Sequence, residues 1–591
     1  MIVTMRKITV VVQEKDRAET LEKLSQLGLV HVENLREPAG RTLEEARERL
    51  NVVKKTLLSL PMEVKSTGPG PEMELEELIN RVATLKDDQA KLRDRSEKNR
   101  RLVEEWEVWG DFDPRLLRNL NGKGIWVYLT VVPEREVKEL PDDVGVEIFA
   151  RRGGMVYCGI ISEGVKYFHF KTRELPNQRL SEMIREGEKI AQAAREVDQE
   201  LNRLAGFRRL LEQEEELRTR ELEFEEARGG MEGTGQLSYL RGYCPLPDLP
   251  ELEAAGRQNH WGLLMEEPAA DDDPPTLITN PRWVRLIEPV FRLIDTVPGY
   301  REIDSSFVFL IFFSLFFAML IGDAGYGVIF LAATALVHWK YGSRLADQRP
   351  VFLLYILSGG TIVWGALTGT VFGQEWLPVS VTGLVPWLGV QDNIIGLCFL
   401  IGAIHLSIAH LWQLIRKAPS VLALADLGWI AIIWMMFFVA RMFILGDPFP
   451  VFAGILGGVG VLLVIIFSIH PRQFFRELVP RDFALFLNVI SSFADVVSYI
   501  RLFAVGLATV AIADAFNTMA ASLGWSSVLS GLFAAVILLF GHVLNMILGG
   551  MAILVHGVRL NVLEFSGHLG NEWTGRRYSP FRGSKISNSN K

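Results

Sequence analysis

An apolar stretch with one arginine at its centre organises this chain: residues 482–519 read DFALFLNVISSFADVVSYIRLFAVGLATVAIADAFNTM. A charged side chain near the centre of a bilayer costs at least about 2.5 kcal/mol, and such residues face the protein interior or a water path. The neighbours of Arg501 on its own helix face, three and four positions away, include no carboxylate: Val497, Ser498, Ala504 and Val505. We therefore expect the charge partner of Arg501 to lie elsewhere, on another segment or on another protein.

The C-terminal half of the chain is a series of apolar runs. Residues 305–566 alternate such runs with short loops, and runs of this length are typical of membrane spans. The first run, residues 307–339, would form a helix of about 50 Å, too long for a hydrocarbon core of about 30 Å. We predict that GDAGYG at 322–327 divides it into two short helices. Six further spans are predicted, which makes eight: 351–371, 393–415, 424–445, 451–470, 482–519 and 526–565.

Basic residues in the loops support this count. With eight spans and a cytoplasmic N-terminus, the inside loops and the tail carry Lys340, Arg344, Arg349, Arg416, Lys417, Arg472, Arg476, Arg481, Arg576, Arg577 and Arg582. The outside loops at 372–392, 446–450 and 520–526 carry no Lys or Arg, as the positive-inside rule predicts. The GDAGYG turn then faces outside. The last two spans exceed the hydrocarbon core, so they must tilt strongly or project from it.

The charge-rich half predicts two lobes joined by long helices. Residues 5–35 read as strand, helix, strand, and the pattern returns at 237–267, so two such units can form one ferredoxin-like lobe. Between them, apolar residues recur at coiled-coil spacing. They are Leu43, Ala46, Leu50, Val53, Leu57 and Leu60, then Leu75, Leu78, Val82, Leu85 and Leu92 after a KSTGPGP break, and Ile190, Ala194, Val197, Leu201, Leu204 and Leu211 on the return. Strands are predicted at 124–132, 144–152, 155–162 and 165–170.

The predicted fold class is an α-helical transmembrane domain of eight spans plus a cytoplasmic α+β two-lobe domain with an antiparallel coiled-coil hairpin. Its parts are a proximal lobe (1–40 and 235–270), hairpin arms (41–110 and 178–230), a distal lobe (111–177), a linker (271–305), a transmembrane ion-channel domain (306–566) and a cytoplasmic tail (567–591). We expect a multi-pass protein of a bacterial or archaeal plasma membrane.

Several functions are disfavoured by composition and motifs. The net charge of −8 gives no sign of nucleic-acid binding, and three cysteines suit a reducing compartment. The N-terminal residues show no signal peptide. The sequence contains no GxxxxGK[ST], no metal-ligand cluster and no nucleophile elbow. We expect no cofactor and no nucleotide hydrolysis by this chain itself.

Other polar residues of the apolar half have a functional and a structural interpretation. In the last span, helical spacing puts Asn545, Ala552, His556 and Arg559 on one face, although Arg559 also lies close enough to the cytoplasmic end to snorkel. Asp323 is an ion-handling carboxylate or a turn residue. Asp495 and Asp514 flank Arg501 off its face, and Asp514 is expected near the outer surface. His405 and His410 line a water path or pack in the core, and Glu564 lines the path or caps a local charge cluster.

Four parts of the membrane half carry a resemblance: SYIRLFAVGLA around Arg501, FGHVLNMILGGMAILVHGVRLNVLEFSGH followed by YSPF, GDAGYG and WGALTGTVFG. They resemble the membrane subunit of V/A-type rotary ATPases, called subunit a or subunit I. The resemblance covers the whole membrane half in motif and the soluble half in architecture.

The resemblance implies a stator that carries two offset half-channels against a rotating ring of c-type subunits. It assigns ion translocation to Arg501, Arg559, His556 and Asp323. As further lining of the half-channels we predict Asn545, Ser498, Asp495, His405 and Glu564. The implied partners are the ring, peripheral-stalk subunits of E and G type, a central-stalk socket subunit of d/C type, the catalytic A/B head and lipid. Two departures concern the outer half-channel. Thr509 stands where some relatives have histidine, and Gly549 where some have glutamate, so other polar groups must act there.

Two other classes of function remain possible at this point. A secondary transporter with a regulatory domain would show paired internal repeats with interrupted helices, and we find no such duplication. A membrane scaffold would leave the cost of Arg501 and Arg559 unexplained. The sequence does not distinguish H⁺ from Na⁺, or a pump from a synthase.

Overall fold

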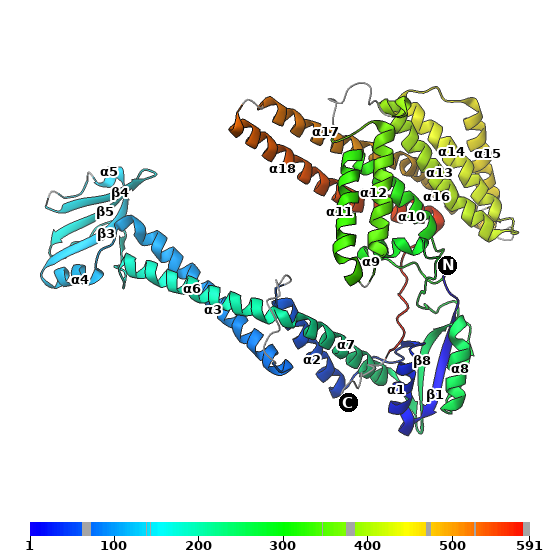
Figure 1. The fold of residues 1–591 in the computed structure, drawn as a ribbon, viewed down its shortest axis with the longest axis horizontal. Coiled ribbons are helices and arrows are strands. Elements are labelled where there is room, and N and C mark those ends of the chain that lie inside the picture. The colour runs from blue at the N-terminus through cyan, green and yellow to red at the C-terminus, as the bar shows by residue number, and fades with distance from the viewer. Residues whose placement is uncertain are drawn as a thin grey trace. The chain divides into compact units, whose positions relative to one another are not determined.

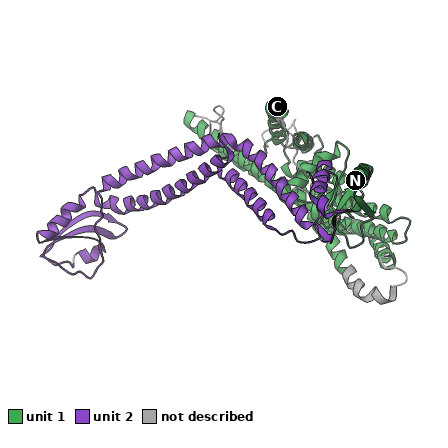
Figure 2. Cartoon of the chain, turned by 90° about the horizontal axis from the view of Figure 1, so that it is seen from below, with its two compact units in different colours: residues 1–10, 29–31, 241–580 green, residues 11–28, 32–240, 581–591 purple. Residues whose placement is uncertain are grey.

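The structure, a computed structural model, describes residues 1–61, 73–137, 139–141, 143–345, 347–373, 384–467, 474–524 and 527–582, without the side chains of 344 and 474–485. The KSTGPGP break and Arg472 lie outside the described residues, as do the side chains of Arg344, Arg476 and Arg481. The chain divides into two compact units (Figure 2). One comprises residues 1–10, 29–31 and 241–580, and the other comprises 11–28, 32–240 and 581–591.

The two predicted strand–helix–strand units interleave in one sheet. They consist of β1 (Met5–Gln13), α1 (Arg17–Leu27) and β2 (His31–Glu33), then β8 (Leu237–Pro245), α8 (Leu249–Gln258) and β9 (Gly262–Glu266). The strand order is β2-β8-β1-β9, so β1 and β8, the first strands of the two strand–helix–strand motifs, are central. The short β7 (Glu232–Thr234) pairs with β8. Helix α1 ends at Gly28, whose φ of 63° is left-handed and therefore suits glycine. This is the arrangement expected of a split ferredoxin-like lobe.

Long paired helices occupy the middle of the compact unit that comprises residues 11–28, 32–240 and 581–591 (Figure 2). Helix α2 (Arg41–Ser59) packs against α7 (Arg208–Gly230), and α3 (Leu75–Trp106) packs against α6 (Leu180–Leu204). Most of the residues with heptad spacing are buried between them, and Leu75, Leu92, Ala194 and Val197 are half-buried. A 3-10 turn at Ala205–Phe207 separates α6 from α7. The heptads thus identify the contact faces of four helices.

A second sheet forms the distal lobe of the same unit. Its strands β3 (Ile125–Pro133), β4 (Gly145–Arg152), β5 (Met155–Glu163) and β6 (Thr172–Arg173) have the order β4-β5-β3-β6 and are antiparallel. The strand predicted at 165–170 is wrong, because those residues form no strand. Their aromatic side chains cover the sheet instead: the ring of Phe168 lies 5.2 Å from that of Tyr128 and 5.0 Å from that of Phe170.

The apolar half is a bundle of helices (Figure 1). They are α10 (Ser306–Ile321), α11 (Ala324–Tyr341), α12 (Arg349–Thr368), α13 (Gln391–Lys417), α14 (Ala423–Leu445), α15 (Val451–Phe467), α16 (Phe474–Ser498), α17 (Ile500–Ser522) and α18 (Val528–Ala552). The predicted break falls at Gly322 and Asp323, where α10 and α11 meet with a bend of 120°. By length and composition, five described helical segments can cross a membrane, or six with the bent pair as one. The shorter α15 is a further apolar helix, and eight separate spans remain a prediction.

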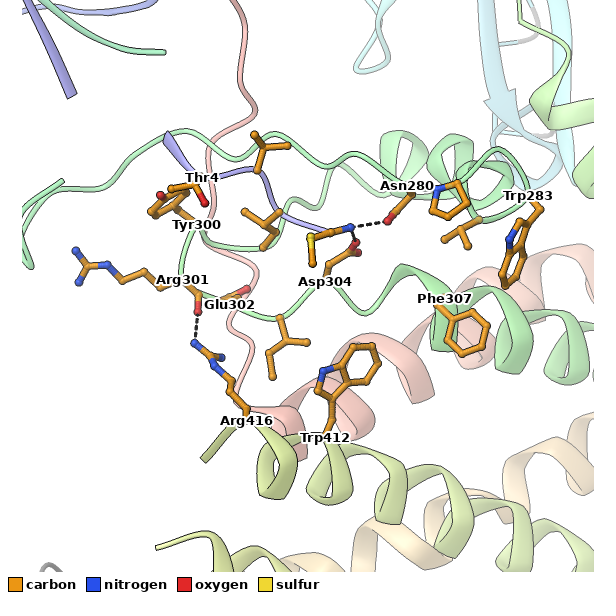
Figure 3. A pocket seen from close by; sticks show the side chains of 16 residues that line it. Thr4, Asn280, Trp283, Tyr300, Arg301, Glu302, Asp304, Phe307, Trp412 and Arg416 are labelled. Atoms are coloured by element: carbon orange, nitrogen blue, oxygen red, sulfur yellow. Dashed lines mark hydrogen bonds and ion pairs between the residues drawn. The ribbon is translucent and has the colours of Figure 1, made fainter. Parts of the chain in front are cut away.

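The linker before α10 is held by the N-terminal residues. Val3 N donates to Leu277 O at 2.8 Å, and Met5 N donates to the hydroxyl of Tyr300 at 2.9 Å. Figure 3 shows the crevice beside these contacts, with a volume of about 780 Å³, where Arg416 donates to Arg301 O at 3.0 Å. The first two of these bonds fix the linker before α10 to the N-terminal residues, up to the start of β1.

Candidate functional site

Arg501 lies directly after a break in the predicted span. Helix α16 ends at Ser498, and α17 begins at Ile500. Arg501 Nε donates to Ser498 O at 2.9 Å, and Nη2 donates to Glu564 Oε1 at 2.5 Å. The Glu564 side chain is only 6% exposed, and that of Arg501 is 21% exposed. The expected partner outside the helix is therefore a carboxylate near the end of the last span.

The same carboxylate also faces the second arginine. Arg559 Nε lies 3.5 Å from Glu564 Oε1. The helix is π-helical at Ile553–Gly557 and at Leu560–Phe565, and π turns are rare and frequent at functional sites. They widen the helix, so α-helical spacing does not hold beyond Ala552. The common face of Asn545, Ala552, His556 and Arg559 assumes α-helical spacing throughout, so it stays a prediction. The nitrogen His556 Nδ1 is buried and has no hydrogen-bond partner among the described residues.

Five polar residues form a chain of contacts next to this pair. Asp495 Oδ2 lies 3.1 Å from His568 Nε2, and His568 Nδ1 lies 2.9 Å from His410 Nε2. His410 Nδ1 lies 3.4 Å from Asp426 Oδ1, and Asp426 Oδ2 accepts from Lys417 Nζ at 2.8 Å. We call Asp495, His568, His410, Asp426 and Lys417 the histidine chain.

A cavity of about 460 Å³ connects the histidine chain with the arginine site. Its lining includes Asp495, Glu564, His568 and His410. The second oxygen of Glu564, Oε2, is buried without a hydrogen-bond partner among the described residues. A polar space with several acceptors suits water or a small cation. The cavity therefore joins Glu564, and through it Arg501, to a row of titratable groups.

His405 and Ser498 lie beside the helix break that precedes Arg501. His405 is fully buried, and its ring stacks between those of Phe312 at 3.8 Å and Phe565 at 4.4 Å. Its Nδ1 lies 2.8 Å from the hydroxyl of Tyr499, the residue at the break before Arg501. The hydroxyl of Ser498 donates to the backbone of Asp495. His405 thus has the surroundings of a core histidine that holds the helix break in place.

Asp323 holds two segments together through backbone N–H groups. Its Oδ1 accepts from Gly325 N at 2.7 Å and Tyr326 N at 3.2 Å, which caps α11. Its Oδ2 accepts from Gly373 N at 2.8 Å, in the segment after α12. The residue is only 1% exposed. Asp514, by contrast, is exposed on α17.

Asn545 lies in a separate polar cluster on α18. Its Nδ2 donates to Thr509 O at 2.7 Å and to the Tyr326 hydroxyl at 2.9 Å, and this hydroxyl lies 2.8 Å from His542 Nδ1. We call Tyr326, Thr509, His542 and Asn545 the Tyr326 cluster. Sequence reasoning missed Tyr326, His542, Asp426 and His568. Polar residues within apolar runs were the available signal, but their pairing depends on contacts between distant helices.

Comparison with models of known protein families finds no match. The chain is 31% identical to "V-type ATP synthase subunit I 1" of Treponema pallidum (strain Nichols), an alignment that covers 98% of this chain and 100% of that one. It is 30% identical to "V-type ATP synthase subunit I" of Borreliella burgdorferi, with coverage of 98% and 99%. An "A-type ATP synthase subunit I" of Methanocaldococcus jannaschii is 26% identical over 62% of this chain and 58% of that one.

A solved structure, the "cytoplasmic N-terminal domain of subunit I, homolog of subunit a, of V-ATPase", matches 44% of this chain and 99% of that one. Its TM-score is 0.23 and its identity is 13%. The two relatives of 30% identity or more extend over nearly the whole length of both chains. The chain therefore belongs to the family of V-type and A-type ATP synthase subunit I, as a membrane subunit of that complex.

Proposed function

We propose that this chain is the stator subunit of a V/A-type rotary ATPase and that it forms two half-channels with a rotating ring of c-type proteolipids. Protons or sodium ions pass through them, coupled to ATP hydrolysis or synthesis elsewhere in the complex. The observation that carries the proposal is the contact of Arg501 Nη2 with Glu564 Oε1, which holds a permanent cation in the apolar half of the chain.

The hydrogen bonds of Arg501 support a role at the ring. Nε is engaged by Ser498 O and Nη2 by Glu564, while Nη1 has no hydrogen bond to the described residues. A guanidinium remains protonated and offers donors in a fixed plane. The free side of that plane can therefore face a ring carboxylate. A nearby cation favours the ionised form of a carboxylate, so the ring releases its ion opposite Arg501, which also blocks a direct leak.

Each half-channel has candidate residues. For the inner half-channel, the cavity beside Glu564 and Asp495 leads along the histidine chain toward Lys417, at the end of α13 that the positive-inside rule assigns to the cytoplasm. Arg559 and His556 flank the same region on the last span, with Ser498 and His405 as supports. For the outer half-channel, we propose Asp323 and Asn545, which belong to the end of the bundle near the GDAGYG turn.

The paired helices of the soluble half support a role as an attachment arm. Helix α3 alone has 32 residues, about 48 Å at 1.5 Å per residue. We propose that the lobes bind peripheral-stalk subunits of E and G type. The central-stalk socket subunit and the catalytic A/B head then interact with this chain indirectly.

Purification from native membranes in mild detergent tests the proposal. Mass spectrometry should find a ring-forming proteolipid and the nucleotide-binding subunits in stoichiometric amounts. Reconstituted vesicles should show ATP-driven ion uptake that is absent with Arg501→Gln. Isolation of this chain without a proteolipid, or uptake that is unaffected by Arg501→Gln, would refute it.

A further inference from the structure

The Tyr326 cluster joins three helices that are far apart in sequence. Tyr326 is in the first turn of α11, Thr509 is in α17, and His542 and Asn545 are in α18. Asn545 is 1% exposed, and its Oδ1 is buried without a hydrogen-bond partner among the described residues. A buried amide oxygen without a partner is costly, which points to a ligand such as water or a hydrated proton at this place.

The hydrogen bonds of the cluster suit one tautomer of His542. Because Thr509 O can only accept, the atom of Asn545 that faces it must be the amide nitrogen. The same nitrogen donates to the hydroxyl oxygen of Tyr326, and this hydroxyl can donate its own hydrogen to His542 Nδ1. In that arrangement the neutral imidazole carries its proton on Nε2. The ring is half-buried, so it is not enclosed on all sides.

Thr509 and Gly549, the two positions that depart from the family pattern, are both involved in close contacts. A Cβ at Gly549 would lie 2.9 Å from Ile321 Cδ1, so there is no room for a longer side chain without a shift of Ile321. The hydroxyl of Thr509 donates to Gly506 O at 2.7 Å in its own helix. His542 and Asn545 lie seven and four positions before Gly549, two turns and one turn away on the same helix face.

The cluster is separated from Arg501 by about two turns of helix. Thr509 follows Arg501 by eight residues on α17, a rise of about 12 Å. Asn545 bonds to Thr509, so it lies at that level on α18. This distance suits a group that exchanges protons, through water, between the outer solvent and the region of Arg501. On α11, α17 and α18, the titratable and charged groups nearest to His542 along their helices are Tyr326, the capping Asp323 and, exposed on α17, Asp514. Arg501 lies about two turns away on α17, and His338, Lys340 and Tyr341 lie at the other end of α11.

We propose that His542 is the proton-exchanging residue of the outer half-channel, with Tyr326 and Asn545 as the residues that position it. This inference rests on the proposed function of the chain. The imidazole gains one proton and one positive charge from water on one side and returns one proton to water on the other. Only N–H and O–H bonds form and break, and the reverse direction uses the same steps.

The chemistry of the cluster favours a proton over a sodium ion at this point. Imidazole exchanges protons near neutral pH, whereas hard cations prefer carboxylate, carbonyl and water oxygens. The cluster offers a ring nitrogen, a phenol and one amide oxygen. The proposal therefore also assigns protons as the ion that passes through this half-channel.

The test uses the whole complex in proteoliposomes. His542→Gln can still accept the hydrogen bond of Tyr326 but cannot take up a proton, so ATP-driven proton uptake should fall at least about tenfold with assembly intact, on the scale of a lost proton-transfer group. His338→Gln is the matched control, because His338 Nδ1 also lies next to a tyrosine hydroxyl, that of Tyr355 at 3.3 Å. It should transport as the unchanged protein does.

A second variant and a reference variant make the result decisive. Tyr326→Phe should lower uptake and shift its dependence on the pH of the outer solution, because the hydroxyl that orients the imidazole is lost. Unchanged uptake and pH profile in Tyr326→Phe overturn the proposal even if His542→Gln does not assemble, as does normal uptake in an assembled His542→Gln complex. Normal uptake in Arg501→Gln would instead refute the proposed function itself.

Discussion

Arg501 and Glu564 are 63 positions apart, yet Nη2 of the arginine lies 2.5 Å from Oε1 of the glutamate. The same oxygen lies 3.5 Å from Nε of Arg559. Two permanent cations thus share one carboxylate, and the group keeps a net positive charge. A further carboxylate, such as the one that we propose on the ring, can complete the charge balance, whereas a third cation is repelled.

Arg501→Ala and Arg501→Gln should abolish coupled ion transport while the complex still assembles, because they remove the fixed charge that we propose to lie opposite the ring. Arg501→Lys should also fail or transport poorly, since an ammonium lacks the planar fork of donors. ATP-driven uptake into vesicles measures this. Arg441→Gln is the control, because Arg441 lies in α14 and pairs with Asp447 at 2.7 Å, away from the site. Uptake in the Arg501 variants equal to that of the control would contradict the prediction.

Glu564→Gln should destabilise the membrane half, because it leaves Arg501 and Arg559 without their shared carboxylate. Removing one partner of a fully buried pair costs about 3–5 kcal/mol, and the exposure of both arginines reduces this to about 2 kcal/mol. Thermal unfolding in detergent measures it. The double variant Glu564→Gln with Arg559→Gln should recover part of the loss, since one unpaired cation is removed. Strictly additive losses would show that Arg559 and Glu564 do not interact.

Asp323→Asn should both lower stability and slow transport. An amide has one acceptor oxygen, so it cannot accept from Gly325, Tyr326 and Gly373 as the carboxylate does. The loss of one buried acceptor costs about 1–2 kcal/mol, visible as a lower unfolding temperature. The exposed Asp514→Asn should leave stability unchanged. A stable Asp323→Asn protein with slow transport would leave only the ion-handling role, and a fully active one would leave only the cap.

A cysteine at Leu384 tests the eight-span topology. Leu384 is 76% exposed and follows α12, in a loop that the positive-inside rule assigns to the outer side. The three native cysteines are buried, so the new thiol should dominate labelling. Impermeant maleimide should react from the outside of intact cells only. Reaction only in inverted vesicles would mean that α10 and α11 count as one span.

Asp272→Asn should remove part of the acid sensitivity of stability. Lys7 Nζ contacts both carboxylate oxygens of Asp272, at 2.7 and 2.9 Å, and this hydrogen bond holds the pKa of Asp272 below its ordinary value. A lowered folded-state pKa stabilises the protein above the unfolded pKa of about 3.9, and this contribution is lost as the pH falls through the folded pKa.

The Asp272→Asn protein should accordingly be less stable by about 1 kcal/mol at pH 7, a difference that shrinks as the pH falls below the unfolded pKa and disappears below the folded pKa. Thermal unfolding of the detergent-solubilised protein across this range measures it. Asp271→Asn, at an exposed neighbouring position, is the control and should follow the unchanged protein at every pH. A difference that persists at low pH would assign the effect to packing.

The sequence determined those features that depend on local periodicity and on the cost of burying charge. The strands of the first lobe follow from apolar alternation. Gly28 marks a helix end, and the heptad residues mark the contact faces of the long helices. Arg501 is identified by the free-energy cost of a charge in an apolar span. Alternation alone was insufficient at residues 165–170, where aromatic side chains cover a sheet instead of pairing in it.

Only the tertiary structure decided which polar groups meet. The pairing of Arg501 with Glu564, of His410 with His568 and of Tyr326 with His542 joins residues more than 60 positions apart, and helix packing sets these distances. The π turns around Arg559 change the register of the last span, so spacing rules fail there. Packing also decides where polar groups can lie on the last span. Ile321 occupies the space beside Gly549, so the polar side chains of this region are those of Asn545 and His542, one and two turns earlier.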